Sequence, residues 1–194
     1  MMIILDDSTK LLPSKIQDDN FKLTDGQRIA FDVSPVNIVL NHYANKLGFA
    51  YDEYGEISAS GELDQQFLNQ LNNLSFYEKE PPKSLGLEWV KSSVFPILEK
   101  SELDVKVILS TFVEHIAIQI SKVIISSNSV LFTGGGAYNT FLMERIAYHS
   151  KVEINLPKET LIDFKEALIF SFLGLLKLKG EINCLKSVTG ASKN

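Results

Sequence analysis

Three consecutive glycines, Gly134-Gly135-Gly136, lie between the apolar segment Leu131-Phe132-Thr133 and a helical pattern that follows Asn139. In a strand, glycine turn and helix unit, a ligand can approach the glycine backbone closely, and the helix N-terminus favours negative charge. The alternative is a tight turn without a ligand. Because a run of glycines costs conformational entropy, we favour a binding role for Gly134, Gly135, Gly136 and Asn139.

The spacing of the glycines does not identify the class of ligand. Gly134-x-Gly136-x-x-Asn139 approximates the dinucleotide fingerprint, and Glu153 lies near the expected acidic distance. However, Asn139 stands where a third glycine or alanine is expected, and only two βα units follow one another. No Gly-Lys-Ser/Thr follows the glycines, which excludes a P-loop. A nicotinamide dinucleotide is therefore the less favoured ligand.

Asp32 is the second candidate, near the end of an apolar segment that predicts a strand over 28–33. Ligands of open α/β sheets bind at the carboxyl ends of strands. A carboxylate there could act as a general base or hold magnesium through water. The alternative is that Asp32 caps the turn at Ser34-Pro35 or the helix that begins near Asn37. The spacing alone does not decide between these interpretations.

The remaining polar candidates carry weaker signals. Glu166 is expected near the start of an apolar helix, where the helix dipole alone would favour an acid. His42, His115 and His149 have no ligand spacing and are expected to be surface or partly buried side chains. Cys184 has no activating neighbour and is expected to be a passive thiol.

The elements that must position these residues follow from hydrophobic periodicity. We expect residues 1–27 to be irregular with a possible short strand at 2–5, and residues 28–194 to form a single α/β domain. Apolar spacing predicts a further strand at 28–33 and then strands at 129–133 and 152–155. It also predicts the helices 37–47, 63–74, 87–98, 103–127, 140–150 and 162–179. The chain would end in two βα units, which implies a mostly parallel sheet flanked by helices.

Composition limits the class of protein. The chain has 194 residues, 45% hydrophobic and 22% charged, with a net charge of -5 and one cysteine. These values exclude a disordered or disulfide-built protein and argue against nucleic acid or an anionic membrane as partner. The N-terminus has no basic region typical of a signal peptide, and the apolar run 167–176 is about half the ~20 residues of a membrane span. We therefore expect a soluble, cytoplasmic protein.

Five ordered segments together resemble the anhydro-N-acetylmuramic acid kinases. They are Phe31-Asp32-Val33-Ser34-Pro35-Val36-Asn37, Pro82-Lys83-Ser84-x-Gly86-x-Glu88, Thr133-Gly134-Gly135-Gly136-Ala137-Tyr138-Asn139, Glu166-Ala167 and Val188-Thr189-Gly190-Ala191. The resemblance covers residues 28–191. It implies the C-terminal domain of an actin-like, RNase H-like ATPase or sugar kinase that takes part in peptidoglycan recycling and amino sugar metabolism.

The resemblance implies a particular reaction and particular roles for the candidate residues. Such kinases use ATP, with Mg²⁺, to open the 1,6-anhydro ring of the sugar and phosphorylate its 6-oxygen, giving N-acetylmuramate 6-phosphate. Asp32 matches the catalytic base, and the loop Gly134–Gly136 with Asn139 matches the nucleotide side. Ser34, Asn37 and Glu166 match positions that face the sugar. No protein ligand for a metal is implied among these residues.

The sequence also departs from the family pattern. Ser34 and Val36 replace two glycines that are common in the family, and the chain has no Gly-Thr-Ser-x-Asp-Gly phosphate loop, Ser-His-Gly-Gln segment or Asn-x-Gly-Gly strand. We therefore expect one of two kinds of protein. The chain is half of a kinase and is inactive without a separate N-terminal half, or it is a truncated, non-catalytic domain that binds nucleotide, sugar or a partner. A homodimer is a further alternative.

Overall fold

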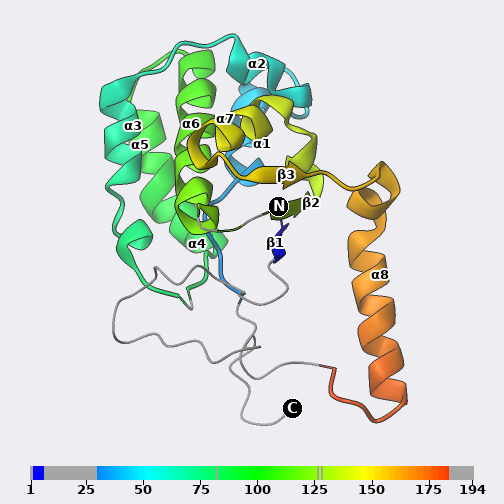
Figure 1. Cartoon of the computed structure of the whole chain (residues 1–194). Helices are drawn as coiled ribbons and strands as arrows, with labels where there is room; N and C mark the ends of the chain where they lie inside the picture. Colours follow the sequence, from blue (N-terminus) through cyan, green and yellow to red (C-terminus); the bar gives the residue numbers. More distant parts are fainter. Residues whose placement is uncertain (1, 7–29, 82, 126, 128, 184–194) are drawn as a thin grey trace.

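The computed structural model describes residues 2–6, 30–81, 83–125, 127 and 129–183 (Figure 1). The described residues form helices around a small sheet, so the predicted α/β class is confirmed. The elements, in chain order, are β1 (Met2–Asp6), α1 (Asn37–Lys46), η1 (Glu53–Gly55), α2 (Glu56–Ala59), α3 (Gln65–Asn72), η2 (Ser75–Glu78), α4 (Leu87–Trp89), η3 (Val90–Val94), α5 (Phe95–Lys100), α6 (Val105–Ile124), β2 (Ser129–Thr133), η4 (Gly135–Tyr138), α7 (Thr140–Ser150), β3 (Glu153–Asn155) and α8 (Glu159–Leu178).

The sheet has three described strands in the order β1-β2-β3. β2 and β3 are parallel, with Ser129 opposite Glu153, as two consecutive βα units predict. The short N-terminal strand is confirmed as β1, but it is antiparallel to β2, with Met2 opposite Thr133. The described sheet is therefore mixed: its parallel pair is the one that was predicted, and β1 adds an antiparallel pair.

The strand predicted at 28–33 is absent from the part of this segment that the structure describes, residues 30–33. The backbone of these residues is instead joined to a loop, because the Asp32 N–H donates to the Lys83 carbonyl oxygen at 2.9 Å. An apolar run shows that a segment is partly buried, but it does not show whether the partner of its backbone is a strand or a loop.

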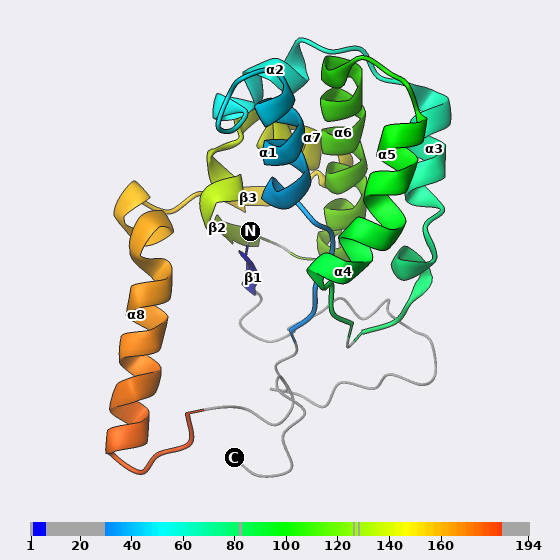
Figure 2. The same ribbon diagram turned by 180° about the vertical axis from the view of Figure 1, so that it is seen from behind.

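α6 is the central helix of the core, and α1, α2, α3 and α7 lie around it (Figures 1 and 2). Its apolar side chains from Ile108 to Ile124 are mostly buried, and so are the polar residues Ser110, Glu114 and Gln119. By length and composition α6 could cross a membrane, but 78% of its most apolar window is buried inside the fold, as in the core helix of a domain. The packing of α6 on α7 brings the glycine turn to the body of the protein.

Helix ends follow capping chemistry in several places. Asp64 caps α3 by accepting the Phe67 N–H at 2.7 Å, and Asp104 caps α6 by accepting the Lys106 N–H at 2.8 Å. Gly48, with φ of 88°, ends the turn after α1. Asn37 does not cap α1, because it is the first residue of that helix and Val36 occupies the N-cap position.

The helical segment predicted at 87–98 contains a π turn, η3, between α4 and α5. A π turn accommodates one extra residue in a helix. On one side of it Trp89 packs against Phe76, with ring centroids 5.0 Å apart, and on the other side Leu98 is buried in the core. The turn thus lets both halves of the segment present apolar side chains to the protein.

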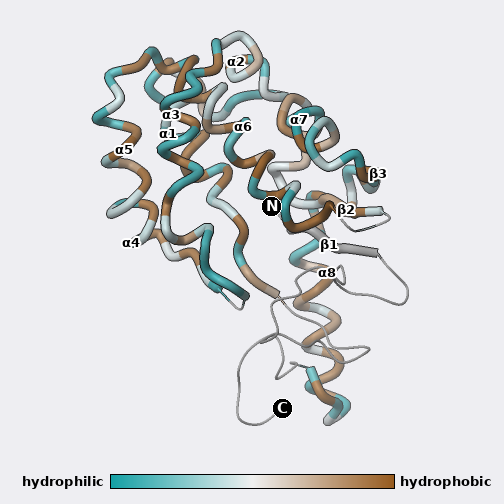
Figure 3. The backbone as a smooth tube through the Cα atoms, turned by 60° about the vertical axis from the view of Figure 1, so that its left-hand side comes forward, coloured by the Kyte–Doolittle hydropathy of each residue, from teal (hydrophilic) through white to brown (hydrophobic). Residues whose placement is uncertain are grey.

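α8 stands away from the other helices and contacts the body mainly through β2 and η4 (Figure 2). Its first turn is anchored, since Ile162 is buried and Asp163 accepts a hydrogen bond from the Tyr138 hydroxyl at 2.8 Å. Beyond this turn hydrophobic residues recur along the helix, as the brown segments of Figure 3 show, and most of its side chains are exposed. This arrangement leaves a largely apolar helix in solvent.

Candidate functional site

Asp32 lies in the extended segment before α1, and the loop after Pro81 holds it in place. Its carboxylate Oδ2 accepts hydrogen bonds from the Ser84 hydroxyl at 3.0 Å and the Leu85 N–H at 2.6 Å. The side chain is exposed, and no hydrogen bond within the described residues occupies Oδ1. Asp32 therefore does not cap α1 or the Ser34-Pro35 turn, as one interpretation of the sequence had it; it presents one oriented carboxylate oxygen to solvent.

Ser34 is half-buried and its hydroxyl lies 3.3 Å from the hydroxyl of Tyr77. Burial raises the pKa of Tyr77 to about 12, although the hydrogen bond to Ser34 works against this shift. The Tyr77 phenol is thus protonated at neutral pH and can donate to Ser34. The serine that replaces a family glycine is joined to the protein interior by this contact.

A buried polar cluster lies behind Tyr77, and the sequence did not indicate it. His115, which was expected at the surface or partly buried, is fully buried on α6 with its ring 4.7 Å from that of Tyr77. Its Nδ1 lies 2.7 Å from Asn72 Oδ1, which also accepts a hydrogen bond from Gln119 at 2.7 Å. The only available signal was that His115 lies within a helix that is apolar on nearly all sides.

Asn37 and Gly135 bring the Asp32 segment to the glycine turn. A Cβ placed on Gly135 would lie 3.2 Å from Asn37 Nδ2, so the amide of Asn37 sits directly beside that glycine. Both residues are exposed. Two candidate segments that are about 100 residues apart in the sequence therefore form one continuous surface.

The glycine turn joins β2 to α7 through η4. Gly134 has a positive φ, 82°, in the region that favours glycine, whereas the φ of Gly135 is not positive. The Ala137 N–H donates to the Gly134 carbonyl oxygen at 2.8 Å and closes the turn. Thr133, just before the turn, has a buried hydroxyl without a hydrogen-bond partner within the described residues.

Asn139 has a structural role in addition to any role in binding. Its side-chain Oδ1 caps α7 by accepting the Leu142 N–H at 2.8 Å, and the residue is buried. Asn139 packs closely on Gly55, where φ is 80° and a Cβ would collide with the Asn139 Oδ1. A cap explains the asparagine at this position without a ligand, which sequence spacing alone did not indicate.

An ion cluster fixes α7 to α6. Glu114, buried on α6, accepts hydrogen bonds from Arg145 Nε at 2.6 Å and Nη2 at 2.9 Å, and its carboxylate lies 2.7 Å from His149 Nε2. Burial alone would raise the pKa of Glu114, but the hydrogen bonds and charges of Arg145 and His149 outweigh it, so this pKa is lowered. The cluster keeps the glycine turn at a fixed position against the core.

Glu166 is exposed on α8 and lies apart from the other candidates. The helix begins at Glu159, so Glu166 is beyond the first turn and the helix dipole does not explain it. No hydrogen bond within the described residues joins Glu166 to Asp32, Ser34 or Asn37, and α8 leans away from the body (Figures 1 and 2). The structure therefore brings together the candidates of the Asp32 segment and the glycine turn, but not Glu166.

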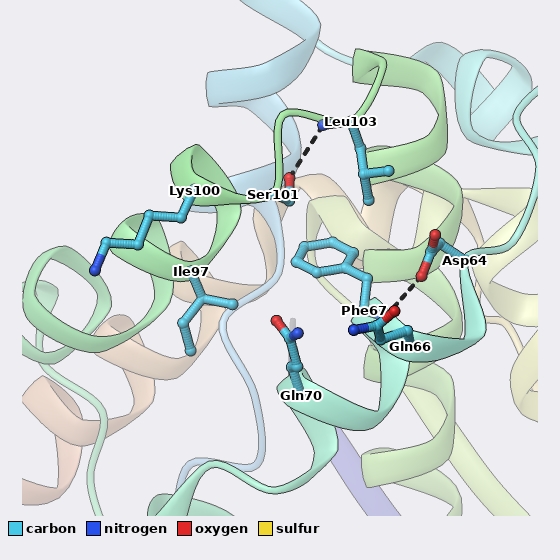
Figure 4. Close-up of a pocket in the computed structure, with 8 residues that line it drawn as sticks. All are labelled: Asp64, Gln66, Phe67, Gln70, Ile97, Lys100, Ser101 and Leu103. Atoms are coloured by element: carbon cyan, nitrogen blue, oxygen red, sulfur yellow. Dashed lines mark hydrogen bonds between the residues drawn. The ribbon is translucent and has the colours of Figure 1, made fainter.

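A hollow of about 400 Å³ lies elsewhere, between α3, α5 and the turn before α6 (Figure 4). Its lining includes Phe67, Ile97, Lys100 and Leu103, and none of the predicted site residues. Asp64 and Ser101 at its edge already bond the backbone N–H groups of Phe67 and Leu103. Among the described residues, no group of three or more His, Cys, Asp or Glu side chains could hold a metal ion.

Comparison with known proteins identifies the family of the chain. A family model for anhydro-N-acetylmuramic acid kinase matches residues 21–194. Proteins of this name are 32% identical over 184 residues in Psychrobacter cryohalolentis, 30% over 182 residues in Xylella fastidiosa and 29% over 175 residues in Sulfurovum sp. NBC37-1. The matches cover 85%, 86% and 86% of this chain but 43%, 46% and 48% of those relatives.

The chain belongs to the anhydro-N-acetylmuramic acid kinase family. It spans less than half the length of these relatives. The resemblance carried by the five ordered segments is confirmed.

Proposed function

We propose that this chain is the catalytic-base part of a cytoplasmic, ATP-dependent kinase that converts 1,6-anhydro-N-acetylmuramic acid to N-acetylmuramate 6-phosphate. The observation that supports this most is the contact of the Asn37 amide with Gly135. It joins the surface that carries the Asp32 carboxylate to the turn where a nucleotide would lie. An actin-like arrangement of two domains around ATP is part of the same proposal.

Asp32 is the proposed general base. Its Oδ1, which no hydrogen bond within the described residues occupies, would take a proton from water while the water oxygen forms a bond to the anomeric carbon of the sugar. The bond from that carbon to the 6-oxygen breaks, and the 6-oxygen attacks the γ-phosphorus of ATP as the bond to ADP breaks. Ser84 and Leu85 fix Oδ2, so that the carboxylate keeps one orientation during the proton transfer.

The other candidate residues would bind rather than react. Gly134, Gly135 and Gly136 would allow close approach of the nucleotide, and Asn139 would hold the start of α7 beside it. Ser34, Asn37 and Glu166 would face the sugar. Magnesium accompanies ATP in kinases generally, and the described residues include no group of three or more His, Cys, Asp or Glu side chains that could hold it.

The experiment is the substitution Asp32→Asn in an enzyme assembled from this chain and the part of the kinase fold that it does not match. The amide has the size of the carboxylate but cannot accept the proton, and general-base catalysis typically contributes about 10²–10⁴-fold. We expect sugar-dependent ADP release to fall by at least 100-fold while ATP affinity stays nearly unchanged. Glu62→Gln, at an exposed acid outside the five family segments, serves as the control; turnover of Asp32→Asn within threefold of wild type would contradict the assignment.

A further inference from the structure

One face of α8 carries a continuous row of exposed apolar side chains, which we call the α8 stripe: Leu161, Phe164, Leu168, Phe172 and Leu175. The spacings of three and four residues are those of a helix face that packs against another element. The exposed fraction runs from 36% at Leu161 to 64% at Phe164. At 1.5 Å per residue the stripe is about 21 Å long. Soluble monomers seldom leave such a continuous apolar surface in water.

The anchoring of α8 fixes which way the stripe faces. Ile162 and Asp163 attach the helix to the body, the first by burial and the second through Tyr138. At about 100° per residue, the stripe lies on the side of the helix opposite these two residues. Glu166, three and four positions after them, lies on the anchored side.

We propose that the α8 stripe is the docking surface for the part of the anhydro-N-acetylmuramic acid kinase fold that this chain does not match, whether that part is joined to it or separate. The family match includes α8, while the relatives have more than half of their length outside the match. A counterpart of α8 therefore exists in proteins that have enough further chain to cover it.

The distribution of apolar side chains favours an occupant of domain size. Outside the stripe, Phe170 is 71% exposed and Leu178 is 87% exposed, so α8 is apolar on several sides. A helix of this kind is normally buried all round. A second copy of α8 would cover one stripe only, whereas a domain can surround the helix.

This inference rests on the proposed function and makes it more specific. With its stripe covered, α8 would be held both by the contacts of Ile162 and Asp163 and by its stripe. Glu166 on the anchored side would then be held between the two parts of the enzyme. Docking of the stripe is in this way the step that would bring Glu166 to the sugar.

The test uses this chain and, as a separate polypeptide, the part of the Psychrobacter cryohalolentis relative that it does not match. Sedimentation velocity of the mixture should show a 1:1 complex. Leu168→Glu and Phe172→Glu should each weaken it at least tenfold. Phe49→Glu, at a residue that is 56% exposed after α1, should leave the affinity within twofold.

Three results would overturn the proposal: stripe variants that bind as well as wild type, a homodimer of this chain that Leu168→Glu dissociates, or binding of the stripe to vesicles of phosphatidylglycerol in place of the polypeptide. If the separate part does not fold, the two are fused and Leu168→Cys is introduced with Cys184→Ser. Maleimide should then label position 168 at least tenfold more slowly in the fusion than in this chain alone, and equal rates would overturn the inference. Docking without sugar-dependent turnover would contradict the proposed function but not the docking surface.

Discussion

Gly135 is the residue at which nucleotide binding can be tested with the least disturbance of the backbone. The left-handed conformation that glycine favours falls on Gly134, and a Cβ on Gly135 would meet only the Asn37 amide, at 3.2 Å. A valine at position 135 would therefore fill the space beside Asn37 without imposing a positive φ on a branched residue.

We expect Gly135→Val to weaken ATP binding at least tenfold, because its branched side chain occupies the surface where the nucleotide would lie. Binding to the wild-type chain should itself be weak, about millimolar, since an open site buries less ligand than a closed one. Titration of labelled backbone amides with ATP, ADP and NADH measures this, with Gly174→Val, in open space on α8, as control. Shifts confined to NADH, or remote from residues 133–141, would restore the dinucleotide interpretation.

His115 makes stability depend on pH through its burial. Burial, followed by the charge of Lys122, lowers the pKa of His115 to about 3, whereas an unfolded histidine has a pKa of about 6.5. Between these values the unfolded chain binds one more proton than the folded one, so stability falls as the pH is lowered through 6.5.

For His115→Gln, we expect the loss of unfolding free energy between pH 7.5 and pH 5.0 to be about 2 kcal/mol smaller than for wild type. Urea unfolding at the two pH values measures the difference. His42→Gln, at an exposed histidine beside Phe95, should keep the wild-type pH dependence. An identical pH dependence in His115→Gln and wild type would show that His115 is not the titrating group.

At the scale of elements, the junction of α6 and α7 depends on the Glu114 cluster. Arg145 donates to both carboxylate oxygens of Glu114 and is itself partly exposed, with 29% of its side chain accessible. Removing one partner of a buried ion pair leaves the other without compensation, but exposure of Arg145 to water reduces that cost.

Glu114→Gln is therefore expected to lower the free energy of unfolding by about 2 kcal/mol, less than the loss of a fully buried pair. The same substitution at Glu144, an exposed acid of α7, should change it by less than about 0.5 kcal/mol. Urea unfolding at pH 7 compares them. Equal effects in the two variants would mean that the cluster does not hold α7 in place.

The sequence predicted the elements with the clearest hydrophobic pattern. α6 and α7 lie close to their expected positions because their apolar residues recur at the helical period, and β2 does so because it is a short apolar run that ends just before the glycines. The region around Asp32 was harder, since its apolar residues meet a loop rather than a strand. Local spacing could not show that Ser84 binds Asp32 or that Asn37 reaches Gly135, because both contacts join distant segments. His115 was missed for the same reason, since its partner Asn72 lies on another helix.

At the scale of the whole molecule, the chain lacks a Gly-Thr-Ser-x-Asp-Gly segment with which a kinase of this family would hold the transferring phosphate. We expect no sugar-dependent ADP release from this chain alone, because positioning and electrostatic stabilisation supply nearly all of phosphoryl-transfer catalysis. A coupled assay with ATP and the anhydro sugar measures it. Turnover at the ordinary kinase rate of about 1–100 s⁻¹ would refute this expectation.

The π turn at Val90–Val94 makes the length of its segment as important as its composition. Each residue of a helix turns the chain by about 100°, and the wider π turn takes up one extra residue while Trp89 still meets Phe76 and Leu98 still lies in the core. The loss of that one residue would leave a regular α-helix with the same two contacts, whereas the gain of another would rotate one half of the segment and break one of them. Over many generations this segment should therefore tolerate the loss of one codon better than the gain of one.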